Sequence, residues 1–356
     1  MLDSQPLDAT AADWSERCEH WRNKPVPTAR PRRRRERETA PLILTGHGVS
    51  LKVDKGSLLV RNGFTHHPQR PETRRFFPGD LETPQRIIMI DGSGQLTFDA
   101  LNWLSEQGVH LVRLNWCGEV VCVLAANGYA ADPAKLEWQK RTREDEAARL
   151  EFAGGLIRRK LLAALETMEA IIPASPARDV AVTRAEESIA RIDGGAVSEV
   201  AQLRGLEGPC ANAYFSAWAG LAMNWKSETR HPVPPQWREY RQRSTLLSGV
   251  KGKNRKADHP INAMLNYAYA MLESEVRINA AAEGYDPMVG IYHHAAKGSP
   301  AYVFDLMEPE RPRIDRAVLK FALSEKFTAA DFILRQDGVC RLGPQLAGMV
   351  CKAVTV

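Results

Sequence analysis

Apolar and polar residues alternate along the first third of the chain in a way that predicts short β-strands. Glycine-containing turn sequences at Gly46-His47-Gly48 and Asp54-Lys55-Gly56 divide the first three runs. The expected strands are Leu42–Thr45, Val49–Val53, Leu58–Arg61, Arg86–Ile90, Val109–Leu114 and Val120–Leu124. Helical spacing of apolar residues predicts one helix among them, over Thr97–Glu106. The proline-rich segment 62–85 is expected to be a long loop.

From Pro133 onward the apolar residues recur at helical spacing instead. We expect one helix from Pro133 to Leu165, a second over Val180–Ile192, and a third that opens at Asp258-His259-Pro260. The predicted fold class is therefore α+β. A small β-rich domain, residues 41–127, is followed by a larger all-α domain, residues 133–356.

Residues 1–40 form an N-terminal extension that contains RPRRRRERE at Arg30–Glu38. Its proline and charge content favours a disordered, solvated tail. Two alternatives remain open. The segment could be a basic arm that neutralises phosphates, or Trp14, Cys18 and Trp21 could line one face of a short docking helix.

Composition narrows the class of protein. A chain of 356 residues with 44% hydrophobic residues predicts two domains with sizeable cores. No apolar run reaches the roughly 18 residues of a membrane span, and the N-terminus lacks a signal-peptide pattern, so we expect a cytoplasmic protein. The six cysteines are scattered, which is typical of reduced thiols. A net charge of +5 favours a polyanionic partner.

Residues 226–258 are strongly basic, and Trp237 and Tyr240 are interleaved with the charges. Basic residues mixed with aromatic rings suit a DNA backbone and its exposed bases. A surface loop that only maintains solubility is the alternative. Under the first interpretation, the candidate DNA contacts of this segment are Arg241, Arg243, Lys251 and Arg255.

The stretch Gly290–Arg316 carries the strongest chemical signal. His293 and His294 precede Asp305 and Glu308, whose spacing of three places both carboxylates on one face of a helix. Carboxylates bind hard divalent cations, and an imidazole shifts the preference toward Mn²⁺ without excluding Mg²⁺. The alternatives are solvated histidines and a carboxylate pair that serves a helix N-terminus. Glu207, in a second apolar stretch, strengthens the metal interpretation.

Several ordered motifs resemble the CRISPR-associated integrase family, the metal-dependent nuclease-integrase of spacer acquisition. The similar segments are Leu203-Arg204-Gly205-Leu206-Glu207-Gly208 with Ala213-Tyr214-Phe215, Gly290-Ile291-Tyr292-His293, Asp305-Leu306-Met307-Glu308 with Arg311-Pro312, Asp258–Ala263, and Thr45–Val49. The resemblance spans about residues 41–340. Residues 1–40 have no counterpart in it, and Pro209 and the doubled histidine depart from the pattern.

The resemblance implies that Glu207, His293 and Glu308 bind the metal and that Asp305 is an additional acidic residue at the site. His293 is favoured over His294 because it follows Gly290-Ile291-Tyr292. Arg204 and Arg311 are further candidate DNA contacts. The implied cofactor is Mg²⁺ or Mn²⁺.

The implied activity is insertion of short double-stranded DNA fragments into a CRISPR array by transesterification, with endonuclease activity when water attacks. The implied partners are DNA, a second copy of the chain in a homodimer, and a small ferredoxin-like CRISPR-associated protein. Two alternatives remain. One is a stand-alone metal-dependent nuclease that acts on branched DNA in repair or transposition. The other is a catalytically inactive DNA-binding scaffold.

Overall fold

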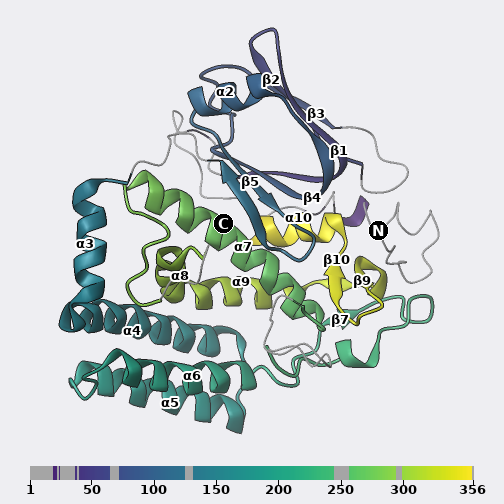
Figure 1. Ribbon diagram of the computed structural model, residues 1–356. Coiled ribbons are helices and arrows are strands. Elements are labelled where there is room, and N and C mark those ends of the chain that lie inside the picture. Colours follow the sequence, from purple (N-terminus) through teal and green to yellow (C-terminus); the bar gives the residue numbers. More distant parts are fainter. Residues whose placement is uncertain are drawn as a thin grey trace.

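The computed structural model describes residues 19–21, 24, 37, 40–64, 72–124, 131–243, 256–293 and 299–354. A β-sheet built from the first part of the chain lies over a larger helical region (Figure 1). This arrangement confirms the predicted order of a β-sheet region followed by a mainly helical one. The expected boundary between residues 127 and 133 stays a prediction, because residues 125–130 lie outside the described part.

The sheet has six strands in the order β3-β2-β1-β4-β5-β6. Their bounds are β1 Leu42–Asp54, β2 Ser57–Arg61, β3 Thr73–Phe76, β4 Arg86–Leu96, β5 His110–Leu114 and β6 Val120–Leu124. Strands β1, β4 and β5 run parallel, and helix α2 (Phe98–Glu106) connects β4 to β5. Parallel neighbours need such a crossover.

Two details of the sheet differ from the prediction. The runs expected as separate strands around Gly46-His47-Gly48 form one strand, β1, with register shifts on either side of His47. Both glycines have positive φ, so the strand bends at them without ending. Strand β3 lies in the segment expected to be a loop. Its first three residues are exposed, so no apolar alternation marks it.

The two faces of the sheet bury different partners. On one face, Leu44 and Ile87 pack with Trp103 of α2. On the other, Ile43 and Ile88 pack into the core of the helical region, and α10 (Pro344–Ala353) lies against β1. Alternate residues of a strand point to opposite faces of the sheet. Because both faces are covered, apolar residues occupy successive positions along these strands.

The helical region contains short strands as well as helices, which corrects the all-α expectation. The helices are α3 Pro133–Glu144, α4 Glu146–Ile171, α5 Pro176–Asp193, α6 Val200–Ser216, α7 Pro260–Ala282, α8 Ala301–Met307, α9 Arg311–Ser324 and α10, with 3-10 turns η1 Pro235–Trp237, η2 Glu308–Glu310 and η3 Ala329–Asp331. Strand β7 (Asn224–Trp225) pairs with β8 (Lys326–Phe327), and β9 (Phe332–Leu334) pairs with β10 (Cys340–Leu342). None of the helices in the described ranges is long and apolar enough to cross a membrane.

Asp145 divides the single helix that was expected from Pro133 to Leu165. Its backbone is extended, and its carboxylate accepts hydrogen bonds from the amides of Ala147 and Ala148. An aspartate that caps the following helix in this way stops the preceding one. The result is a separate helix α4, which packs against α6, α8 and η2.

The N-terminal extension contacts the body of the protein through Trp21, Arg37 and Lys24, which pairs with Glu325. The Trp21 side chain is buried, packs against Phe321 and Phe327, and donates from Nε1 to Asp331 Oδ1 at 3.1 Å. The Arg37 guanidinium donates to the carbonyls of Thr83 and Gln107. These contacts correct the expectation of an entirely solvated tail and favour docking at Trp21. Trp14, Cys18 and the Arg32–Arg35 run lie outside the described residues.

The basic segment 226–258 also differs from expectation. Trp237 and Tyr240 are almost fully buried, and Trp237 packs against Trp225 and Phe332. These rings belong to the core and cannot stack on DNA bases, so that part of the DNA-binding hypothesis is wrong.

Candidate metal centre

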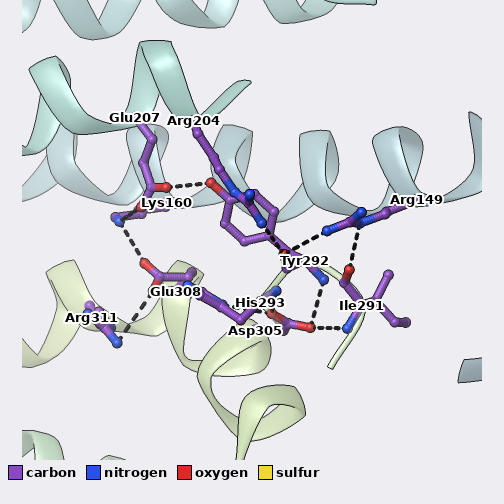
Figure 2. A network of polar contacts seen from close by, with 10 residues as sticks. All are labelled: Arg149, Lys160, Arg204, Glu207, Ile291, Tyr292, His293, Asp305, Glu308 and Arg311. Carbon is purple, nitrogen blue, oxygen red and sulfur yellow. Dashed lines mark hydrogen bonds and ion pairs between the residues drawn. The ribbon is translucent and has the colours of Figure 1, made fainter. Parts of the chain in front are cut away.

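Three segments that are distant in sequence meet against α4, and Figure 2 shows their side chains together. Glu207 comes from α6, the segment Gly290–His293 follows α7, and Asp305 and Glu308 come from α8 and η2. Helix α6 runs through Pro209 and carries both Arg204 and Glu207. The structure thus brings together Glu207, His293, Asp305 and Glu308, the residues that the motifs predicted.

Asp305 is fully buried and organises the histidine segment. Its Oδ2 accepts hydrogen bonds from the amides of Ile291 at 2.6 Å and Tyr292 at 3.0 Å. Its Oδ1 accepts from the His293 amide and from His293 Nδ1, both at 2.8 Å. Because both oxygens are engaged, Asp305 holds His293 in place and is not itself directed at a cation.

The contact with Asp305 also determines which nitrogen of His293 can bind a metal. A carboxylate only accepts, so Nδ1 carries a proton, and in the neutral imidazole Nε2 presents its lone pair. His293 Nε2 lies 3.9 Å from Glu308 Oε1. A ligating histidine whose other nitrogen donates to a carboxylate is a common feature of metal sites. His294 lies outside the described residues.

Lys160, on α4, lies between the two glutamates. Its Nζ is 2.5 Å from Glu207 Oε1 and 2.6 Å from Glu308 Oε2. Burial alone would raise the pKa of Glu308, but Arg311 and Lys160 outweigh it and hold that pKa below its usual value. Burial likewise disfavours the charged Lys160, yet Glu308 and Glu207 raise its pKa, so the ammonium remains charged.

Tyr292 and Arg311 complete the contacts of the carboxylates. The Tyr292 hydroxyl donates to Glu207 Oε2 at 2.5 Å, and burial together with that bond raises the pKa of Tyr292. Arg311 Nη2 lies 3.4 Å from Glu308 Oε1. Hydrogen-bond donors and cationic groups therefore surround both glutamates.

Among the described residues, no three His, Cys, Asp or Glu side chains already lie together as a ligand set for a metal ion. The donor chemistry nevertheless fits one. Glu207 and Glu308 converge on a single cationic group, the Lys160 ammonium. The 3.9 Å between His293 Nε2 and Glu308 Oε1 is within the span of two ligands of one Mg²⁺, about 4.2 Å at bond lengths of about 2.1 Å.

The predicted DNA contacts have different surroundings. Arg204 donates to the Tyr292 carbonyl at 2.8 Å, so it fastens α6 to the histidine segment. Arg241 is exposed. Arg243 donates to Asn266 Oδ1, and both Arg243 and Arg311 lie over the Tyr269 ring. Lys251 and Arg255 lie outside the described residues.

A polar groove of about 670 Å³ is lined by Met307 and Arg311, which stand on either side of Glu308 in the sequence. Its lining includes Arg243, Arg277 and Arg311 from the helical region and Cys117–Val121 from the β5–β6 turn. We call it the arginine groove. Arg311 lines the groove and also contacts Glu308, so this one side chain connects the groove to the site.

Sequence reasoning did not identify Lys160, Arg149 or the donor role of Tyr292. Arg149 donates from Nε to the Ile291 carbonyl at 2.9 Å and so helps to hold the histidine segment. A signal for Lys160 existed. It falls at the apolar spacing of α4, four residues after buried Leu156 and four before buried Ala164. A lysine at a core-facing position requires a buried anionic partner.

Known proteins resemble the chain over nearly its whole length. The sequence profile of the family described as CRISPR associated protein Cas1 matches residues 42–238 and 242–355. The CRISPR-associated endonuclease Cas1 1 of Methanospirillum hungatei is 25% identical over 318 residues, covering 88% of this chain and 86% of that protein. The CRISPR-associated endonuclease Cas1 1 of Thermus thermophilus is 29% identical over 300 residues, covering 84% and 80%. A solved structure of a casposase bound to an integration product superposes with a TM-score of 0.72 at 25% identity, covering 89% and 82%.

Proposed function

Since the chain belongs to the CRISPR associated protein Cas1 family, we propose that it is a divalent-metal-dependent DNA endonuclease and integrase that inserts short DNA fragments into a CRISPR array. The curated relatives are named endonucleases, and the casposase was captured on an integration product. The observation that carries the metal dependence is the convergence of Glu207 and Glu308 on one cation beside His293 Nε2.

Glu207, His293 and Glu308 would hold the cation, which is Mg²⁺ or Mn²⁺. When bound, it would withdraw charge from the attacked phosphate and orient the attacking oxygen. Asp305 keeps the Nδ1 proton on His293, and Arg311 keeps a positive charge at the mouth of the site. A 3′-hydroxyl of the incoming fragment displaces a 3′-oxygen of the target strand. One phosphodiester forms as another breaks, so no external energy source is needed.

The arginine groove is the proposed path of the DNA backbone to the carboxylates. Three guanidinium groups, those of Arg243, Arg277 and Arg311, line it. In the described structure, Arg243 Nη1 and Arg311 Nε have no protein hydrogen-bond partner although both atoms are buried. Phosphate oxygens are acceptors that guanidinium groups bind well.

The proposed assembly is a homodimer with a small ferredoxin-like CRISPR-associated partner. A fragment has two ends, and each end must be joined to a different strand. Two copies of the site, related by symmetry, would meet that requirement.

The test is a strand-transfer assay on supercoiled DNA that carries a CRISPR repeat, with Mg²⁺, Mn²⁺ and chelator arms. Wild type should form integration products only with a divalent ion. Glu207→Ala, His293→Ala and Glu308→Ala should each lose integration and cleavage while DNA binding persists, because the three ligands act as one cluster. Full activity in any of them would remove that residue from the proposed ligand set.

The same assay separates the alternatives. Products on supercoiled DNA without a repeat, at the same rate, would indicate an integrase or nuclease that acts outside a CRISPR array. Metal-independent binding without any product would indicate an inactive scaffold. Both outcomes would contradict the proposed function.

A further inference from the structure

Lys160 takes the central place among the proposed metal ligands. It reaches from α4 to Glu207 on α6 and to Glu308 on η2, and its side chain is only 16% exposed (Figure 2). The side chain of Glu308 is 3% exposed. A buried ammonium with two carboxylate partners is therefore the element that joins these three segments electrostatically.

The contacts of each carboxylate oxygen show what a cation would encounter. Lys160 Nζ donates hydrogen bonds to Glu207 Oε1 and Glu308 Oε2. The Tyr292 hydroxyl donates to Glu207 Oε2, and Arg311 forms an ion pair with Glu308 Oε1. The place from which one cation can contact both Glu207 Oε1 and Glu308 Oε2 is the place that the Lys160 ammonium occupies. An ammonium and a divalent ion repel each other, so both cannot occupy the same place between two carboxylates.

We propose that Lys160 is a positioning residue that holds the place of the metal ion. In the metal-free protein it keeps Glu207 and Glu308 together, and it must move away when a divalent ion binds. Lys160 thereby competes with the metal and lowers its apparent affinity. This inference rests on the proposed metal site and adds a residue that determines how easily that site is loaded.

The reason for such a placeholder is electrostatic. Without a cation, the half-buried Glu207 and the buried Glu308 would be two like charges in a largely enclosed site. Like charges at such distances raise one another's pKa or force the side chains apart. Lys160 prevents both effects, so the ligands are already near one another when the ion arrives. The lysine side chain is long and flexible, which allows it to leave without movement of the backbone.

The experiment is a titration of the purified, metal-free, full-length protein with Mn²⁺ in the absence of DNA. Free Mn²⁺ is followed by electron paramagnetic resonance. Lys160→Met and Lys160→Gln should each bind Mn²⁺ at least about tenfold more tightly than wild type, because the competing charge is gone. The matched control is Arg159→Met. Arg159 is the neighbouring residue of α4, is exposed, and has the Gly155 carbonyl as a hydrogen-bond partner, so its loss should leave the affinity unchanged.

Thermal melting provides a second measurement that does not depend on activity. In chelator, both Lys160 variants should melt below wild type, because the carboxylates then repel each other. Saturating Mn²⁺ should raise their melting temperatures more than that of wild type. Lys160→Gln keeps a hydrogen-bond donor, so it provides the result if Lys160→Met does not fold.

Equal or weaker Mn²⁺ binding in both Lys160 variants would overturn the inference. The Glu308→Ala variant in the same titration separates this failure from failure of the proposed function. If wild type binds Mn²⁺ and Glu308→Ala does not, the metal site stands and only the role of Lys160 is refuted. If Glu308→Ala binds as wild type does, the metal site itself is wrong, and the inference fails with it.

Discussion

Replacing Asp305 by asparagine should release the histidine segment while leaving all three proposed metal ligands in the chain. Asp305 accepts four hydrogen bonds, two at each oxygen, from Ile291, Tyr292 and His293. An asparagine keeps one oxygen and places an NH₂ group at the other position. With the NH₂ group at either position, the two N–H groups on that side face another donor. At the Oδ1 position, His293 Nδ1 can avoid this clash only by moving its proton to Nε2, the nitrogen that is proposed to bind the metal.

The size of the effect follows from that count. A hydrogen bond to a charged group contributes about 1.5–3 kcal/mol, so the loss of two destabilises the local structure by about 3–6 kcal/mol. Since about 1.4 kcal/mol is a factor of ten, amide hydrogen exchange at residues 291–293 should accelerate at least about a hundredfold. Loss of the hydrogen bond between His293 Nδ1 and the Asp305 carboxylate should also weaken metal binding by about 10–100-fold.

The assay combines hydrogen exchange read by mass spectrometry with the Mn²⁺ titration and strand transfer. Asp286→Asn is the matched control. It makes the same change in the turn before the segment, where Asp286 Oδ1 is exposed and accepts one bond from the Met288 amide. Unchanged exchange at residues 291–293 in Asp305→Asn would refute the positioning role. Faster exchange with unchanged metal binding would refute the link between that role and the ligand.

Three further predictions concern the fold, acid stability and DNA binding. Trp21→Ala should lower the free energy of unfolding by about 3–5 kcal/mol in urea denaturation, because it leaves a cavity against Phe321 and Phe327; an unchanged midpoint would mean that the N-terminal extension does not dock. Burial lowers the pKa of His259 to about 4, below its unfolded value of about 6.5, so this residue contributes stability above pH 6.5 that is lost as the pH falls toward 4. His259→Asn can still cap α7, so its urea midpoint should fall less between pH 7 and pH 4.5 than that of wild type, and an equal fall would contradict the assignment. Replacing Arg241 and Arg243 by glutamine should lessen the salt dependence of DNA binding by about 0.9 in log–log slope per lost phosphate contact, and a wild-type slope would exclude both from the interface.

Local patterns were sufficient for elements whose signal lies in their own residues. Helix α7 begins at Pro260 behind the His259 cap, as its sequence predicted, because capping and apolar spacing are local properties. Strand β3 could not be predicted in this way. Its residues 73–75 are exposed at the sheet edge, and pairing with β2 determines its conformation.

Composition led to a wrong prediction for Trp237, because the burial of a side chain depends on partners that are distant in the sequence. The basic segment around Trp237 suggested a DNA-binding surface because its charges are close together in sequence. The ring is instead enclosed by Trp225 and by Phe332, nearly a hundred residues later. Nothing within residues 226–258 reveals that contact, so an aromatic residue among charges could not be distinguished from one in the core.

The sequence motifs predicted the acidic residues and the histidine of the candidate site. They did not predict the ion pairs that hold these residues together. Glu207, His293 and Glu308 stood out because each belongs to a motif with a chemical interpretation. Lys160 belongs to none, and its two partners lie 47 and 148 residues away along the chain. A single lysine on the apolar side of a long helix indicates that an acidic partner exists, but only the packing of α4 identifies which one.

The two halves of the site differ in how far they can move, and this difference shapes how a cation can enter. The histidine half is fixed to the backbone by Asp305 and Arg149, so His293 Nε2 has little freedom. The carboxylate half is held by flexible side chains, chiefly that of Lys160. In the proposed site, exchange of the ammonium for a metal ion would therefore need side-chain rotation and no rearrangement of α6 or α8. A fixed histidine beside adjustable carboxylates would let the cation replace Lys160 while the protein stays folded.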